Sequence, residues 1–90
     1  MFGWFKKSPA APVKQVWVEH NGFRICATPI AEAGQYRVSG IIEKGEDEAV
    51  KQHRFVRADL IANKDEADAF SVLKAKLMID QMGDAIFSDD

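Results

Sequence analysis

The sequence has a single cysteine and no long apolar run, and these absences exclude several classes of protein. It holds one cysteine, Cys26, among its 90 residues, so an intramolecular disulfide is excluded. No apolar run approaches the roughly 20 residues of a membrane-spanning helix, and residues 1–7 are apolar and then charged, the reverse of a secretory signal. These absences predict a protein of the reducing, cytoplasmic compartment.

An excess of basic charge is also missing. Twelve Lys and Arg stand against 14 Asp and Glu, which gives a formal net charge of −2 at pH 7. This balance disfavours a domain that coats nucleic acid with its whole surface. A local basic stripe is still compatible with it.

Catalytic and metal-binding motifs are not recognisable either. Cys26, His20 and His53 show no CxxC or HxxxH spacing, whereas zinc takes three or four protein ligands. The neighbouring carboxylates at 46–48, 65–66 and 89–90 fall in an expected turn, a helix start and a tail, where nothing buries a general acid or base. The isolated glycines form no phosphate-binding loop. We therefore expect a protein that is not an enzyme, with no catalytic residue, metal, cofactor or small-molecule substrate.

The chain has the length and composition of one folded domain. Ninety residues with 47% hydrophobic content are typical of a single globular unit. The prolines at 9 and 12 predict that residues 1–12 form a flexible tail and linker. We expect a single α+β domain over residues 13–90.

The clearest structural signal is a β-hairpin around Asn21-Gly22. Alternating apolar residues flank this pair, and Asn-Gly favours a two-residue type I′ turn. The turn sets Val18 opposite Ile25 and Trp17 opposite Cys26. On one face the pairs are then apolar, and on the other Glu19 meets Arg24.

Two further strands are expected after this hairpin. A four-residue loop over 31–34 would pair Ile30 with Gln35 and Ala27 with Val38. A charged turn at 44–48 then leads to a fourth strand from about Val50 to Arg57. In a regular strand its apolar residues could not all lie on the same face of the sheet. We therefore expect a bulge near Gln52-His53, with Phe55 facing inward.

A single helix is predicted after the strands. Asn63 is a good N-cap with Glu66 three residues later, and Gly83 stops the helix after Met82. Its expected buried stripe is Phe70, Leu73 and Leu77, beside Ala67 and Met78. Val72, Ile79 and Met82 lie off this stripe, so either residues 85–87 or a partner must cover surplus apolar surface. The predicted fold is a four-stranded antiparallel β-meander packed on one C-terminal helix, a ββββα two-layer sandwich.

Segments in order resemble the small bacterial HlyU-like family: residues 21–25, 34–40, 53–59, and 74–76 with 79–80 and 83. The resemblance spans roughly Val16 to Phe87. It implies a bacterial cytoplasmic protein that regulates transcription, because the family is labelled an activator of hemolysin expression. A winged-helix regulator bears the same name, but a chain with one helix cannot form a helix-turn-helix. The resemblance supplies no catalytic or binding residues.

Two surfaces are candidates for binding. The open sheet face and its edge carry five residues that could meet a partner or nucleic acid, namely Trp17, Arg24, Arg37, Arg54 and Arg57. The same arginines could instead form ordinary cross-strand ion pairs on a solvated face. The tail carries Phe2, Trp4 and Phe5, a candidate contact with a partner or a membrane surface.

Two functions remain open from sequence. The first is a non-enzymatic regulatory or interaction module that acts through protein contacts, as a homodimer or with a larger partner. The alternative is direct DNA or RNA binding through the arginine-bearing sheet face.

Overall fold

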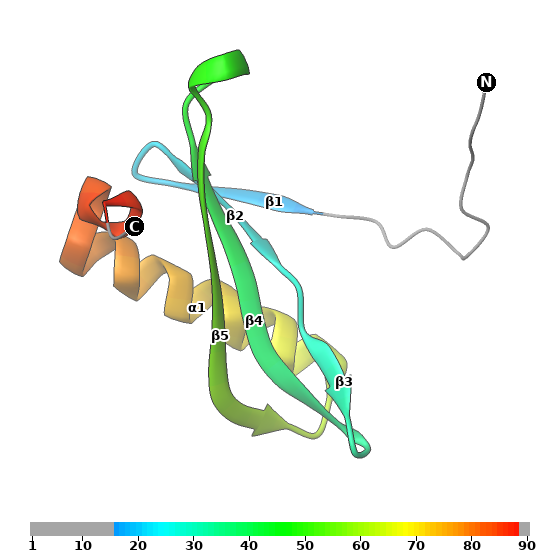
Figure 1. The fold of residues 1–90 in the computed structure, drawn as a ribbon. Helices are drawn as coiled ribbons and strands as arrows, with labels where there is room; N and C mark the ends of the chain where they lie inside the picture. The colour runs from blue at the N-terminus through cyan, green and yellow to red at the C-terminus, as the bar shows by residue number, and fades with distance from the viewer. Residues whose placement is uncertain (1–15, 89–90) are drawn as a thin grey trace, which may run out of the picture.

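A computed structural model describes residues 16–88 of the chain, with a sheet on one side and a helix on the other (Figure 1). The elements are β1 (Trp17–His20), β2 (Phe23–Ala27), β3 (Ile30–Glu32), β4 (Gln35–Lys44), β5 (Lys51–Ile61) and α1 (Lys64–Met82), with short 3₁₀ turns η1 (Asp47–Ala49) and η2 (Gly83–Phe87). The expected antiparallel α+β sandwich is confirmed. The predicted tail and linker over 1–12 lies outside the described residues.

The sheet follows the order β1-β2-β4-β3, and β5 pairs with β4. Residues 24–27 and 30–32 pair with β4 in one continuous register. β2 and β3 are therefore one strand interrupted at Thr28-Pro29, where proline removes a backbone donor. The four expected strands thus appear as five segments, and β5 occupies the other edge of β4.

The first hairpin has the predicted register. Val18 faces Ile25 and Trp17 faces Cys26. Asn21 and Gly22 both adopt positive φ, at 52° and 86°, as a type I′ turn requires.

The second connection is tighter than expected. Ala33 and Gly34 have φ of 51° and 79° and form a two-residue turn, not a four-residue loop. Ile30 consequently pairs with Arg37, and Ala27 with Gly40, a shift of two residues from the predicted register. A shift of two keeps every side chain on its face, so the apolar face survives. The prediction failed because alanine rarely adopts a left-handed conformation.

The fourth strand differs from the prediction in length and in the place of its irregularity. β5 runs from Lys51 to Ile61, and pairing at the expected bulge near residues 52–53 is regular. The irregularity lies further along, where Ser39 pairs with Val56 but Arg37 pairs with Leu60. β5 therefore contains two extra residues opposite β4. Phe55 points inward as predicted and is 7% exposed.

The core lies between the sheet and α1. Its buried side chains come from the sheet, from α1 and from η2: Phe23, Ile25, Val38, Ile42, Phe55, Ala75, Ile79 and Ile86. Residues 85–87 do fold back, because Ile86 is buried and the Phe87 ring stacks on Phe23 at a centroid distance of 6.0 Å.

The helix begins and ends as predicted but buries a different face. Its buried residues are Ala67, Ser71, Ala75 and Ile79, whereas Leu73 and Leu77 of the expected stripe are 48% and 43% exposed. Large sheet side chains fill the space between the layers, so a helix face of mostly small residues fits most closely. Of the residues predicted to be surplus, Ile79 is buried and Val72 packs against the core, whereas Met82 is exposed. The apolar surface on the solvent side of the helix is therefore made by Leu73, Leu77 and Met82.

Candidate interaction surface

The sheet face turned away from α1 is called the outer face here. Strand side chains alternate between the two faces, and Ile25, Ile42 and Phe55 mark the face that meets the helix. The outer face accordingly takes its residues from all five strands: Trp17, Glu19, Arg24, Cys26, Ile30, Glu32, Gln35, Arg37, Ser39, Ile41, Glu43, Gln52, Arg54, Val56 and Leu60.

Apolar side chains are exposed along this face. One row across the strands places Ile30 and Leu60 on either side of Arg37. The exposed apolar residues of the outer face are Trp17 at 37%, Ile30 at 39%, Val56 at 55% and Leu60 at 39%. The solvated face of an antiparallel sheet normally carries polar residues. Exposed apolar side chains on this face are therefore unusual, and a partner could cover them.

The predicted arginines lie on or beside this face, but most are already engaged. Arg24 donates to the Gly45 carbonyl at 2.8 Å and lies 3.5 Å from Glu43 Oε1. The expected pairing of Glu19 opposite Arg24 is right in register, yet the guanidinium turns to Glu43. The reason is the shifted register, which sets Arg24 directly opposite Glu43.

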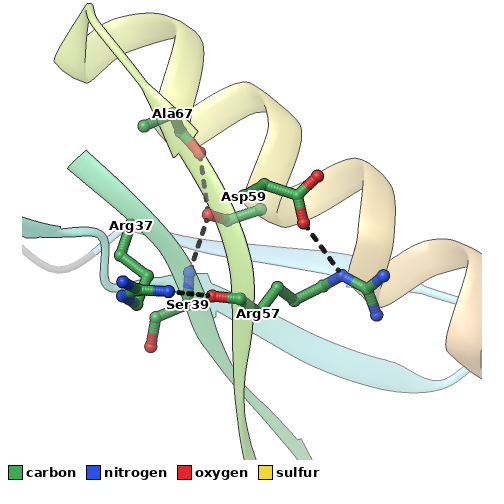
Figure 2. Close-up of polar contacts among 6 residues, drawn as sticks. Arg37, Ser39, Arg57, Asp59 and Ala67 are labelled. Atoms are coloured by element: carbon green, nitrogen blue, oxygen red, sulfur yellow. Dashed lines mark hydrogen bonds and ion pairs between the residues drawn. The ribbon is translucent and has the colours of Figure 1, made fainter. Parts of the chain in front are cut away.

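Arg37 and Arg57 form a second engaged group where β5 carries its extra residues (Figure 2). Arg37 pairs with Glu32 and donates through Nη1 to the Arg57 carbonyl at 3.1 Å. Arg57 Nε lies 3.4 Å from Asp59 Oδ1. Arg54 lies opposite Ile41 and forms no ion pair within residues 16–88.

The outer face is electrically balanced. It carries three arginines, Arg24, Arg37 and Arg54, and an equal number of glutamates, Glu19, Glu32 and Glu43. Affinity for a nucleic-acid backbone rises with the number of phosphates that free cations neutralise. A face whose formal charges cancel offers little of that attraction.

A buried serine pair supports the strand beneath Arg37, and the sequence reading did not find it. Ser39 N–H donates to Ser71 Oγ at 3.3 Å, and Ser71 Oγ donates to the Ala67 carbonyl at 2.7 Å (Figure 2). Both serines are fully buried. The available signal was the spacing of Ala67, Ser71 and Ala75, which marks a face of small residues.

Replacing Ser71 by alanine is expected to lower the free energy of unfolding by about 1–3 kcal/mol, because the Ser39 amide would be left buried without this acceptor. Urea denaturation measures the change. Ser88→Ala is the matched control, since Ser88 is exposed and bonds only the nearby Ala85 carbonyl. Equal stability of the two variants would show that the Ser39–Ser71 bond does not hold the layers together.

Cys26 occupies a packing position between Trp17 and Ile41. Its side chain is 1% exposed, and burial raises the pKa of the thiol, with Asp68 and Glu43 adding to the effect. His20 lies elsewhere, with Nε2 2.9 Å from Asp80 Oδ1. Residues 16–88 contain no group of three or more His, Cys, Asp or Glu side chains arranged to hold a metal ion.

The candidate contact residues of the tail and the question of a membrane span remain to be described. Phe2, Trp4 and Phe5 lie outside the described residues. Within residues 16–88 no helix has the length and hydropathy needed to cross a membrane.

Comparison with known proteins agrees with the sequence resemblance. A family model described as "Transcriptional activator HlyU" matches residues 1–87 of the 90. Neither a curated protein nor a solved structure is similar enough to the chain to count as a match. Because the family model spans nearly the whole chain, the protein belongs to the HlyU family of transcriptional activators.

Proposed function

We propose that this protein is a non-enzymatic regulatory module that acts on transcription through protein contacts made by the outer face. The observation that carries the proposal is the coexistence of exposed apolar side chains and engaged arginines on that face. Val56 and Leu60 are exposed on the strand at one edge, and Trp17 on the strand at the other. In this proposal the protein works in the cytoplasm.

The physical chemistry of the face favours a protein over a nucleic acid. Exposed apolar side chains gain free energy when a partner removes them from water, and aromatic and arginine side chains are enriched at protein interfaces. Arg24 and Arg37 already have carboxylate partners, so a protein can cover them without stranding a charge. A phosphate backbone would have to compete with those carboxylates.

The partner is either a second copy of the chain or a larger protein of the transcription apparatus. Light scattering of the purified protein over a range of concentrations separates the two. A mass that rises to twice that of one chain identifies self-association, and a constant mass of one chain assigns the face to another protein.

Direct DNA binding is tested by fluorescence anisotropy of a labelled duplex at low salt, followed by a salt titration. We expect no saturable binding tighter than about 10⁻⁴ M, the weak end of non-specific affinity. Micromolar binding that falls steeply with salt, and that Arg37→Gln and Arg54→Gln together remove, would overturn the proposal in favour of the nucleic-acid alternative.

A further inference from the structure

A groove opens on the helix side of the sheet, away from the outer face. It runs between the edge strand β1, the end of β2 and the first half of α1, with a volume of about 750 Å³. Its apolar lining includes Val16, Val18, Ala27 and Val72. This volume lies within the range of about 300–1,000 Å³ that holds small ligands, so several side chains fit in it.

The groove is acidic at the helix rim. Asp65 and Asp68 both line it, close to the start of α1. Lys64 pairs with Asp68 at 3.3 Å, and within the described residues Asp65 has no ion pair. One lysine against two carboxylates leaves the rim negative. An occupant that is apolar and basic would complement it.

The chain itself carries a segment of that chemistry. Phe2, Trp4 and Phe5 precede Lys6 and Lys7. The match to the family model begins at residue 1 and so extends over this segment.

The connection is long enough for the segment to return to the groove. Val16 lines the groove, and residues 8–15 link it to Lys7. Eight residues span at most about 26–29 Å, which allows a reversal at the proline-containing linker. A short tether also keeps the local concentration of the segment near the millimolar range.

We infer that residues 2–7 bind in the groove of their own chain, with Trp4 against the apolar lining and the two lysines beside Asp65 and Asp68. The groove and the outer face lie on opposite sides of the sheet. This binding therefore stands or falls independently of the function proposed for the outer face.

The test uses the full chain with Trp17→Phe, which leaves Trp4 as the only tryptophan. Acrylamide quenching and the emission maximum then report how well Trp4 is shielded from water. We expect blue-shifted emission, with quenching several-fold weaker than in the urea-unfolded chain. Ala69 lines the groove, and Ala69→Arg should remove this protection. The larger side chain would fill the groove, and its positive charge would repel the two lysines of the segment.

Leu73→Arg is the matched control, because Leu73 is exposed one turn further along α1 and does not line the groove. It should leave Trp4 protected, and circular dichroism checks that both variants are folded. The inference would be overturned if acrylamide quenched Trp4 as strongly as in the unfolded chain. It would also be overturned if Trp4 stayed protected in the Ala69→Arg variant. Protection that grows with protein concentration would also overturn it, because the occupant would then come from a second copy.

Discussion

Replacing Gly40 by valine is expected to lower the free energy of unfolding by about 2–3 kcal/mol. A Cβ built on Gly40 would lie 2.7 Å from Phe55 Cζ, 2.8 Å from Phe55 Cε1 and 3.1 Å from the Cys26 carbonyl oxygen. Gly40 pairs with both Ala27 and Phe55, and the Phe55 ring is buried against it. Since small domains are stable by only about 5–15 kcal/mol, such a loss would be severe.

Urea denaturation of Gly40→Val and the milder Gly40→Ala measures this effect. The matched test adds Phe55→Leu, which removes the ring that the new Cβ would meet. In the Gly40→Ala background Phe55→Leu should cost clearly less than it does alone, because the two sites are coupled. A Gly40→Ala change within about 0.5 kcal/mol of the wild type, with additive effects, would contradict the close approach of Phe55 to β4.

Local chemistry made the first hairpin and the helix ends predictable. Asn21-Gly22 fixed a turn whose geometry allows one register. Asn63 accepts the Glu66 amide through Oδ1 at 3.1 Å, and Gly83 follows the last helical residue at φ 56°. Each of these features depends on residues close together in sequence, so the sequence alone was enough.

The features that depend on tertiary packing were not predictable in the same way. The buried face of α1 consists largely of small residues because the sheet supplies the large ones, and periodicity alone favoured Leu73 and Leu77. The two extra residues of β5 occur between Val56 and Leu60, where no glycine or proline marks them. Both features required knowledge of what the opposite layer contributes.

The partners of the arginines were missed for one specific reason. The parity of each strand already placed Arg24 and Arg37 on the outer face. The tight turn at Ala33-Gly34 moved the register by two residues, and this brought Glu43, rather than Ile41, opposite Arg24. A basic patch in the predicted register thus became a set of ion pairs in the structure.

The second large effect is expected for Val56→Glu combined with Leu60→Glu on the outer face. A covering partner would bury two carboxylates without counter-charges. A loss of about 2 kcal/mol of binding free energy is typical for a central interface residue. It would raise the dissociation constant for the partner about 30-fold. Stability should change by no more than about 0.5 kcal/mol per site, as for other surface substitutions, because both side chains point to water.

Leu73→Glu combined with Leu77→Glu provides the matched control. It adds the same charge to exposed leucines of α1, on the other side of the molecule from the outer face. Urea denaturation should show that both double variants are folded. A difference between them in cells then reports the outer face and not net charge or stability.

The most direct measurement compares genome-wide transcript levels in cells that carry the wild-type gene, no gene, the Val56→Glu/Leu60→Glu variant or the Leu73→Glu/Leu77→Glu variant. If the outer face makes the regulatory contact, the Val56→Glu/Leu60→Glu cells will match those without the gene, and the Leu73→Glu/Leu77→Glu cells will match the wild type. Wild-type transcript levels in cells carrying a folded Val56→Glu/Leu60→Glu protein would contradict a regulatory role for this face.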